Sequence, residues 1–372
     1  MRISRLVFLV LLGAALVTPM TVDAQPRVPL YLGTYTDGTS KGVYRAEFDI
    51  TTGRLSDPAL VATLASPSFL AWHPTRDVLY AVSETDAGSV VAYAVKADGS
   101  LSKINEQPSG GGAPCYVSVN ASGTHVLVAN YTGGSVSSFA IRADGGLEAV
   151  SVVQHHGASV TDRQKGPHAH SITPAPGGRF LVAADLGTDH LPVYALDPQG
   201  RLVAHSAPEA AVARGAGPRH VAFDPAGATM YAMNELNSTV TTYTWDGVRG
   251  ALLAKGTVST LPAGVMVANT TAHVAVHPSG RFVFGSNRGH DSIAVFRVAA
   301  DKTLTLASTT PAGGKTPRNF AIDPSGNYLL VGNQQSDTIT VFRIDLDSGA
   351  LTPTGQSVSI GAPVCIRFRP ER

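Results

Sequence analysis

Two histidines stand one residue apart in the stretch GPHAHSITPAPGGRF, residues 166–180. His168 and His170 open what reads as a β-strand, and such a pair serves as metal ligands, as buried packing, or as acid/base groups in catalysis. Arginine and glutamate side chains that could work with an acid/base histidine are spread widely along the chain. What chemistry is available therefore depends on the elements that bring distant residues together.

The chain repeats one unit, and repeats dictate architecture. Each unit has an apolar strand, a turn of the Pro-x-Gly kind and a second apolar strand, as in VAVHPSGRFVFGSNR and FAIDPSGNYLLVGNQ. An alternating strand such as DSIAVFRV follows, and then a weaker fourth strand. Four strands per unit are typical of a propeller blade. The turn residues that anchor the units are Pro74, Ala121, Pro176, Pro225, Pro278, Pro324 and Pro370.

The seventh anchor, Pro370, comes with almost no chain left after it. The N-terminal LYLGTYTDGTSKGVYRAEFD matches LLVGNQQSDTITVFRIDLD, so the first strands of the chain complete the last blade. Such closure leaves no open sheet edge. The sequence predicts an all-β, seven-bladed β-propeller with four antiparallel strands per blade, its ring closed by N- and C-terminal strands in one blade.

Residues at one offset from the anchors form a ring about the propeller axis. Two rings are uniform. The ring four residues before the anchor is apolar, which predicts packing: Leu70, Val117, Ile172, Val221, Val274, Phe320 and Ile366. The ring nine residues after it carries short polar groups that hydrogen-bond turns: Thr34, Ser83, Asn130, Asp185, Asn234, Asn287 and Asn333.

Two further rings have no consensus. Six residues before the anchors stand Ser68, Cys115, His170, Arg219, Ala272, Arg318 and Val364. Ten residues after them stand Tyr35, Glu84, Tyr131, Leu186, Glu235, Arg288 and Gln334. In an antiparallel hairpin the start of the first strand lies beside the end of the second, so both rings meet at one mouth of the central channel. Residues that pack between equivalent blades should be of one type in every blade, and these residues are not. We therefore predict the active site at this mouth.

Ring position favours a functional role for His170, whereas His168, two residues earlier, is left open between function and structure. A metal site is disfavoured, because no further ligands complete a set and nearby arginines repel a cation. We expect neither a metal nor another cofactor.

The first residues predict export. Arg2 and Arg5 precede an apolar run over residues 6–17, and Val22-Asp23-Ala24 supplies the small residues of a signal-peptidase cut. We expect a signal peptide over residues 1–24, cleavage near Ala24, and a single propeller domain over residues 25–372 in the periplasm or outside the cell. No later segment approaches the roughly 20 apolar residues of a membrane span.

The amino-acid composition argues against nucleic acid and anionic lipid as binding partners. A net charge of +1, with 15% charged residues and no basic run, gives no footprint for nucleic acid or anionic lipid. The partner we expect is a small molecule, and the protein itself is expected to be a monomer. The two cysteines, Cys115 and Cys365, fall two blades apart, beyond the roughly 7 Å between Cα atoms that a disulfide tolerates, so they should stay unbridged.

The motifs PHAHSI, GPRHVAFDP, YAMNEL and SNRGHDSIAVFRV resemble the seven-bladed lactonase family, which includes propeller-type 6-phosphogluconolactonases and muconate lactonizing enzymes. The resemblance implies a metal-independent site with a histidine, two arginines and a glutamate. Carried onto this sequence, these are His170 (or His168), Arg219, Glu235 and Arg288.

The chemistry of lactone opening fits these residue types. Either Glu235 or His170 could activate water, and Arg219 and Arg288 could hold an anionic group and stabilise developing negative charge. We expect the substrate to be a lactone or a carboxylate, bound also by His168, Arg318, Glu84, Tyr131 and Tyr35. Muconate-type cyclization and a non-catalytic ligand- or protein-binding propeller stay open as alternatives. Export disfavours a phosphorylated sugar lactone, which is a cytosolic metabolite.

Overall fold

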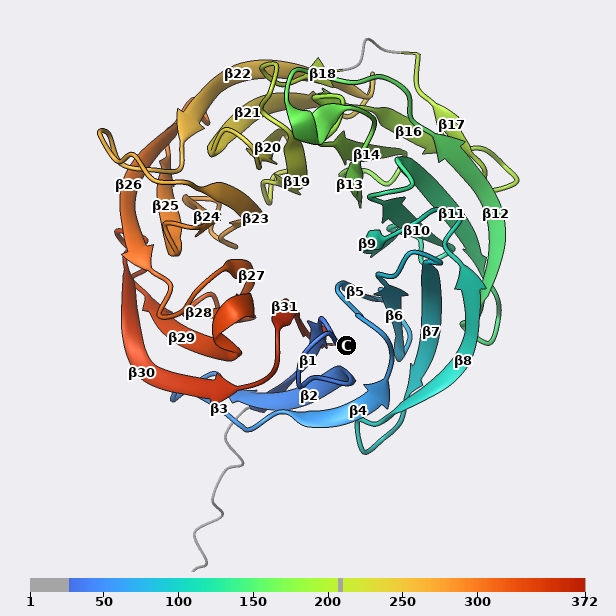
Figure 1. The fold of residues 1–372 in the computed structure, drawn as a ribbon, viewed down its shortest axis with the longest axis horizontal. Helices are drawn as coiled ribbons and strands as arrows, with labels where there is room; N and C mark the ends of the chain where they lie inside the picture. Colours follow the sequence, from blue (N-terminus) through green and yellow to red (C-terminus); the bar gives the residue numbers. More distant parts are fainter. Residues whose placement is uncertain (1–26, 207–209, 372) are drawn as a thin grey trace, which may run out of the picture.

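Seven antiparallel sheets stand around a common axis like the blades of a fan (Figure 1). The computed structural model describes residues 27–206 and 210–371. The predicted seven-bladed β-propeller is confirmed. The predicted signal peptide, residues 1–24, lies outside the described residues.

The blades follow one another along the chain, each running from the axis outward. Blades 1 to 3 comprise β5 (Leu70–Trp72), β6 (Val78–Ser83), β7 (Ser89–Val95) and β8 (Leu101–Pro108); β9 (Pro114–Val119), β10 (His125–Asn130), β11 (Ser135–Ile141) and β12 (Leu147–Gln154); and β13 (Ala169–Pro174), β14 (Phe180–Asp185), β15 (His190–Leu191), β16 (Val193–Leu196), β17 (Leu202–Ala204) and β18 (Ala210–Ala211). Blades 4 to 6 comprise β19 (Pro218–Phe223), β20 (Thr229–Asn234), β21 (Thr239–Asp246) and β22 (Ala251–Ser259); β23 (Thr270–Val276), β24 (Phe282–Arg288), β25 (Ser292–Val298) and β26 (Leu304–Pro311); and β27 (Pro317–Ile322), β28 (Tyr328–Asn333), β29 (Thr338–Ile344) and β30 (Leu351–Ser359).

The closing blade joins the two ends of the described chain. Its inner strand is β31 (Pro363–Phe368), followed by β1 (Arg27–Thr34) and β2 (Gly42–Asp49), with β3 (Arg54–Leu55) and β4 (Ala59–Thr63) both paired to β2. β31 runs antiparallel to β1 from Leu30↔Phe368 to Thr34↔Pro363. The predicted closure by terminal strands is confirmed, and Figure 1 shows the red β31 lying beside the blue β1.

Blade 3 departs from four simple strands. Its third strand is interrupted at Pro192, between β15 and β16, and its fourth is divided into β17 and β18. Proline has no N–H to donate to a ladder, so a central strand breaks where one occurs. The Pro192 carbonyl still accepts a hydrogen bond from Ala183 N at 2.9 Å, which keeps the blade together.

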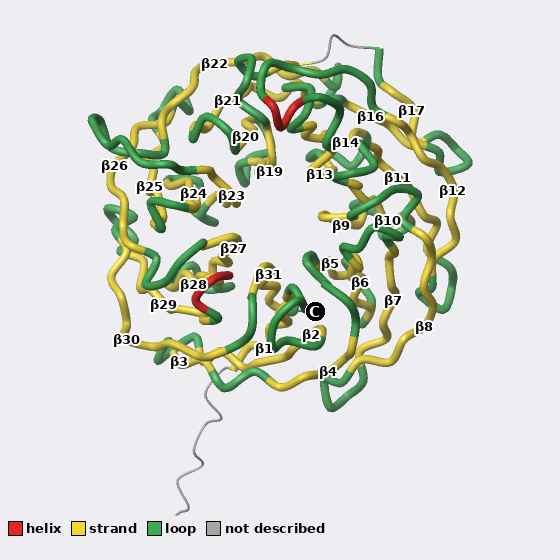
Figure 2. Tube along the Cα trace, viewed as in Figure 1, coloured by secondary structure: helices red, strands yellow, loops and turns green. Residues whose placement is uncertain are grey.

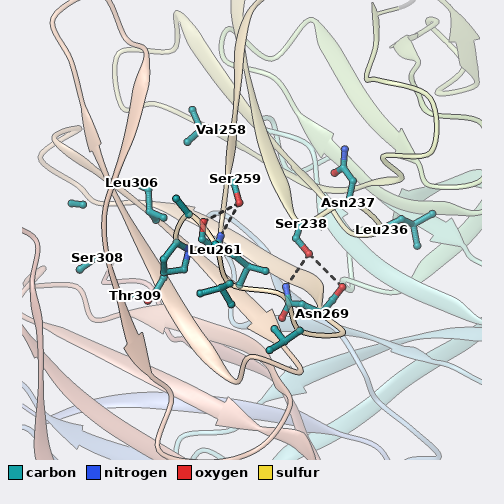
Figure 3. A pocket seen from close by; sticks show the side chains of 16 residues that line it. Leu236, Asn237, Ser238, Val258, Ser259, Leu261, Asn269, Leu306, Ser308 and Thr309 are labelled. Atoms are coloured by element: carbon teal, nitrogen blue, oxygen red, sulfur yellow. Dashed lines mark hydrogen bonds between the residues drawn. The ribbon is translucent and has the colours of Figure 1, made fainter.

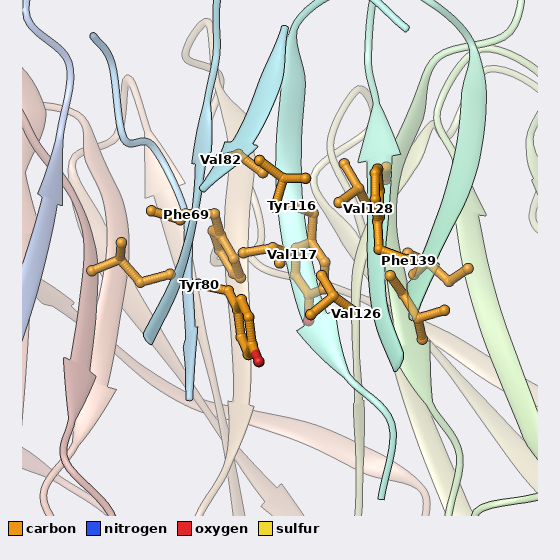
Figure 4. Packing of buried hydrophobic residues seen from close by; sticks show 14 of the residues in the cluster. Phe69, Tyr80, Val82, Tyr116, Val117, Val126, Val128 and Phe139 are labelled. Carbon is orange, nitrogen blue, oxygen red and sulfur yellow. The ribbon is translucent and has the colours of Figure 1, made fainter. Parts of the chain in front are cut away.

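Neighbouring blades pack through alternate side chains of their strands. Figure 4 shows Tyr80 and Val82 of blade 1 and Val117, Val126 and Val128 of blade 2 in one such layer. The predicted apolar ring is buried in every blade: Leu70, Val117, Ile172, Val221, Val274, Phe320 and Ile366. The assignment of that ring to packing is confirmed.

The polar ring nine residues after the anchors is buried as well and serves turns. Asn130 Nδ2 donates to Ser135 Oγ and Ser137 Oγ, each at 3.1 Å. Asp185 Oδ1 accepts from the backbone N–H groups of Gly187 and Thr188 at 2.9 and 3.1 Å. These hydrogen bonds confirm the predicted turn architecture.

Aromatic and histidine rings fill the propeller axis. Phe69 of blade 1 and His220 of blade 4 lie with ring centroids 5.5 Å apart, a contact that crosses the axis because these blades are not neighbours. Tyr116 and His273 complete the group, at 5.2 Å each from His220, and all four side chains are buried or nearly so. We call these four residues the axial plug.

Cys115 and Cys365 are both buried and free, so the prediction that they stay unbridged is confirmed. Among residues 27–206 and 210–371, no helix is long and apolar enough to cross a membrane.

Candidate functional site

A β-bulge stands at the same place in the inner strand of most blades. The pairing register skips Cys115, His170, Arg219, Arg318 and Val364. A bulged residue is left out of the ladder, and bulges beside active sites re-aim a side chain. All five belong to the irregular ring six residues before the anchors. The bulge takes them out of the regular alternation of packed side chains, which explains why their residue types differ from blade to blade.

The second irregular ring is tied to the first by a repeated backbone hydrogen bond. In six blades the N–H of the residue ten after the anchor donates to the carbonyl two residues before the residue of the first ring. These bonds run from Tyr35 to Ala362, Glu84 to Ser66, Tyr131 to Ala113, Leu186 to His168, Glu235 to Gly217 and Gln334 to Thr316, at 2.7–3.1 Å. The bond holds both rings at one mouth of the propeller, as the sequence predicts.

A cavity of about 200 Å³ opens at this mouth. Six predicted site residues line it: Glu84, Tyr131, His170, Glu235, Arg288 and Arg318. Arg163 and Thr270 line it too, and neither was predicted. Two other predicted residues, Arg219 and Tyr35, contact the lining residues, whereas His168 takes a different position.

Glu235 is the centre of the charge network. Its carboxylate lies 2.6 Å from Arg163 Nη1, 2.9 Å from Arg219 Nε and 2.9 Å from Arg288 Nη2. Burial alone would raise the pKa of Glu235, but Arg288 and Arg219 outweigh it and hold the pKa well below the ordinary value. Both oxygens of Glu235 are thus engaged by guanidinium groups, and the carboxylate orders these groups.

Backbone carbonyls fix the two inner arginines. Arg219 Nη1 donates to Ala272 O and Arg288 Nη2 donates to Thr271 O, both at 2.7 Å. Burial lowers the pKa of Arg219 to about 9, so the guanidinium keeps its proton at neutral pH. The side chain of Arg219 is 3% exposed and that of Arg288 13%.

Arg318, Tyr35 and Glu84 form a second chain of contacts across the mouth. Arg318 Nη2 donates to Tyr35 Oη at 2.7 Å, and Tyr35 Oη donates to Glu84 Oε1 at 3.0 Å. Burial raises the pKa of Tyr35, which keeps its hydroxyl protonated. Tyr35 therefore supports two cavity-lining residues, and no carboxylate within residues 27–206 and 210–371 forms an ion pair with Arg318, which is presented to the cavity.

His170 is buried between the cavity and the axial plug. Its ring contacts Tyr131 at 5.2 Å and His220 at 5.4 Å between centroids, and its Nδ1 lies 3.4 Å from Cys115 Sγ. Burial, with a further contribution from Arg219, lowers the pKa of His170 well below its ordinary value. The imidazole is neutral at pH 7.

The structure separates the two histidines with which the sequence analysis began. His168 stacks on Tyr131, with ring centroids 4.6 Å apart and 17° between the planes, and its Nδ1 lies 2.9 Å from Tyr131 O. It is not among the residues that line the cavity. His168 supports Tyr131, whereas His170 faces the cavity.

Arg163 was not predicted from the rings, because it lies in a loop that has no equivalent in the other blades. It belongs to η1 (Asp162–Gln164), one turn of 3₁₀-helix in the loop between β12 and β13, drawn in red among the loops near β13 and β19 in Figure 2. The sequence signal was the 55-residue spacing from Ala121 to Pro176, the longest interval between anchors. That spacing marks an insertion, and the inserted loop precedes β13 and brings Arg163 to the cavity.

A larger hollow of about 930 Å³ lies between the ends of blades 4 and 5 (Figure 3). Its wall includes Ser238, which accepts a hydrogen bond from Asn269 Nδ2 at 2.9 Å, together with Leu261 and Leu306. None of its lining residues is charged or titratable near neutral pH. The acid/base and charged groups gather in the smaller cavity, so we assign the site there.

No group of three or more histidine, cysteine, aspartate or glutamate side chains is arranged to hold a metal ion within residues 27–206 and 210–371. The donors around the cavity are mainly guanidinium groups, whose charge suits an anion.

Comparison with known proteins gives one consistent result. The family model described as Lactonase, 7-bladed beta-propeller, matches residues 29–368. The 6-phosphogluconolactonase of Bacillus subtilis is 36% identical over 345 residues, which cover 91% of this chain and 97% of that protein.

Solved structures agree with this relationship. The periplasmic gluconolactonase of Pseudomonas aeruginosa superposes with a TM-score of 0.89 at 33% identity, covering 92% of this chain and 99% of the other. A protein from Lactobacillus plantarum gives a TM-score of 0.88 at 34% identity, covering 93% and 100%.

Proposed function

The chain belongs to the seven-bladed β-propeller lactonase family, and from this premise we propose that it hydrolyses an anionic or sugar-derived lactone. One observation carries the substrate class. Four guanidinium groups surround the cavity, those of Arg163, Arg219, Arg288 and Arg318, against the two carboxyl groups of Glu84 and Glu235. This excess of positive charge suits a substrate that brings negative charge.

In the proposed mechanism His170 is the general base. Cys115 Sγ lies 3.5 Å from His170 O and 3.8 Å from Ala129 O, so the thiol can donate to a carbonyl while its sulfur accepts the Nδ1 proton of His170. Nε2 is then left with its lone pair. A water molecule gives a proton to Nε2 as its oxygen attacks the acyl carbon.

Arg288 and Arg318 line the cavity and are suited to stabilise the oxyanion of the tetrahedral intermediate. When the ring C–O bond breaks, His170 returns the proton to the departing alkoxide, and a hydroxy acid results. Glu235 holds Arg219 and Arg288 in place throughout. The network therefore supplies a neutral base beside fixed cations, which is what ester hydrolysis needs.

Export is part of the proposal. The predicted signal peptide and the likeness to a gluconolactonase described as periplasmic both support a site of action outside the cytoplasm. A carboxylate-bearing or unphosphorylated sugar lactone is then a more accessible substrate than a cytosolic phosphate ester.

The proposal predicts acid release from lactones. Purified protein is offered neutral and anionic sugar lactones together with aliphatic lactones, and the acid formed is titrated at constant pH. We expect hydrolysis of at least one sugar-derived lactone, with the anionic lactones preferred. Tight binding of a lactone without acid release across the whole panel would contradict hydrolysis and favour a binding propeller.

The change Glu235→Gln tests the central network. It leaves Arg219 and Arg288 buried without their carboxylate, which should destabilise the fold by about 3–5 kcal/mol. Turnover should fall on the order of 10²-fold or more, because the cations lose their placement. The residual activity should keep the pH dependence of the parent, since His170 remains the base.

A matched control is Glu47→Gln, which removes a partly exposed carboxylate paired with Arg45 on β2. A surface pair of this kind contributes about 0–1 kcal/mol, so denaturation of the control should match the parent. If Glu235→Gln retained full activity and parent stability, the network would have neither the catalytic nor the structural role proposed for it. Loss of the acidic limb of the pH profile, along which a general base becomes protonated, would make Glu235 the base in place of His170.

A further inference from the structure

The loop that carries Arg163 is held firmly at its backbone. Gln164 is fully buried, and its Nε2 donates to Leu186 O at 2.8 Å and to Asp189 Oδ1 at 2.7 Å. Gln164 Oε1 accepts from Thr161 N and Thr161 Oγ1, which closes the turn before η1. Asp189 also accepts from Gly217 N at 2.7 Å, so the loop is tied to the segment just before Arg219.

The side chain of Arg163 is exposed in contrast to this anchored backbone. It is 47% exposed, against 3% for Arg219 and 13% for Arg288. It bridges the mouth of the cavity, with Nη1 2.6 Å from Glu235 Oε1 and Nη2 2.7 Å from Tyr131 Oη. Arg163 therefore lies between the cavity and solvent.

Exposure decides which arginine can change partners. Breaking a buried ion pair leaves an uncompensated charge, whereas an ion pair with a half-exposed member exchanges its partner at small cost. Glu235 keeps two buried guanidinium partners if Arg163 leaves it. Of the three arginines on Glu235, Arg163 is the one that a bound anion can recruit.

Cavity-lining side chains also present unfilled hydrogen-bonding atoms. Arg288 Nε and Glu84 Oε2 are buried, and neither makes a hydrogen bond within the described part of the chain. Buried polar atoms of this kind are uncommon, and at a cavity they indicate groups that a ligand completes. Glu84 Oε2 suits a hydroxyl donor and Arg288 Nε suits an anionic oxygen, as a polyhydroxylated acid derivative would offer.

We propose that Arg163 is a specificity-determining residue, which binds the anionic substituent of the lactone at the mouth while the ester lies deeper, against His170 and Arg288. This assignment rests on the proposed lactonase function. The substituent is a carboxylate or a phosphate, because either accepts two parallel N–H bonds from one guanidinium. A neutral lactone has no group for Arg163, so this residue sets the preference for anionic substrates.

The test compares kcat/KM for three lactones of one sugar: the neutral aldonolactone, its 6-phosphate, and the aldarolactone that carries a carboxylate at C6. In Arg163→Gln the ratio of anionic to neutral kcat/KM should fall about 10- to 100-fold, the loss expected for a charge-assisted pair. The anion whose ratio falls further identifies the natural substituent. Arg163→Lys, which keeps the charge without the planar fork, should restore part of the ratio.

Lys165→Met is the matched control, because Lys165 lies on the same loop, is 78% exposed and pairs with Asp162 at 3.1 Å. It removes one positive charge near the mouth and should leave the ratio unchanged. An equal fall in the control would assign the effect to the overall field of the loop and overturn the role of Arg163. An unchanged ratio in Arg163→Gln would overturn it as well.

A binding measurement separates this inference from the proposed function. Calorimetric titration with the aldonate and its 6-phosphate, and with the aldarate, needs no turnover. If the parent protein hydrolyses none of the lactones but Arg163→Gln weakens anion binding about tenfold or more, the reaction is wrong and the assignment of Arg163 stands. If the parent hydrolyses a lactone and Arg163→Gln binds the 6-phosphate and the aldarate as the parent does, the reaction stands and the assignment fails.

Discussion

A chain that ends before Pro363 should fail to fold cooperatively. The deletion removes β31, which pairs with β1 and also contacts β27, β28 and β5. Val364 and Ile366 lose their burial, at about 1.5–3 kcal/mol each, and β1 and the inner face of blade 6 become exposed. This loss is a large part of the roughly 5–15 kcal/mol that stabilises a typical domain. Circular dichroism and calorimetry should show no cooperative transition.

The control deletes only the last two residues, so that the chain ends at Pro370 and β31 is kept entire. It should melt as the parent does. A synthetic peptide of residues 363–370, added to the long deletion, should restore a transition that depends on peptide concentration, because closure is non-covalent. A cooperative melt of the long deletion near the parent temperature would show that the ring does not depend on its terminal strand.

Stability should fall steeply as the pH drops below about 6.5. Burial lowers the pKa of His170, His220 and His273 well below the ordinary value, with Arg219 or Arg367 adding to the effect. The folded protein keeps these three rings neutral, whereas the unfolded chain protonates them as pH falls through about 6.5. Their contribution is fully present well above that pH, and between pH 6.5 and 5.5 the free energy of unfolding should decline by about 3 kcal/mol, roughly 1 per histidine.

Denaturant unfolding at pH 7.5, 6.5 and 5.5 measures this slope before glutamates such as Glu235 begin to titrate. His273→Asn removes one of the three groups and should lower the slope by about a third, whatever it does to stability at pH 7.5. The exposed His156 provides the control, since His156→Asn should leave the slope as it is. A free energy of unfolding that stays level from pH 7.5 to 5.5 would contradict neutral burial of the three histidines.

The fold was predictable from the sequence because every blade repeats the same pattern of apolar strands and turns. A hairpin recurs every 46 to 55 residues, and apolar positions such as Ile172 and Phe320 hold one offset in every unit, since each must pack between blades. The same regularity exposed His170, Arg219 and Glu235 as departures from it. In a repeat protein, a functional site can be found from the sequence at positions where the residue type differs from blade to blade.

Other parts of the site carry no periodic signal. Arg163 lies in an insertion without an equivalent offset, and only the lengthened spacing pointed to its loop. His168 shares a motif with His170 but lies under Tyr131, because the bulge at His170 turns the two side chains to different surroundings. The burial of Glu235 among three arginines depends on contacts between blades that no single repeat describes.

The bulges have a consequence for how such proteins diversify over evolutionary time. A residue outside the ladder can be exchanged without shifting the register of the strand around it, so its side chain is constrained by its neighbours at the mouth and not by strand pairing. Because the blade is repeated, the same bulged position recurs in five blades around the axis. In this chain it holds a histidine and two arginines, but also Val364, an aliphatic side chain that serves no polar contact. Descendants could acquire new substrates by changing such a position while keeping the inherited scaffold intact.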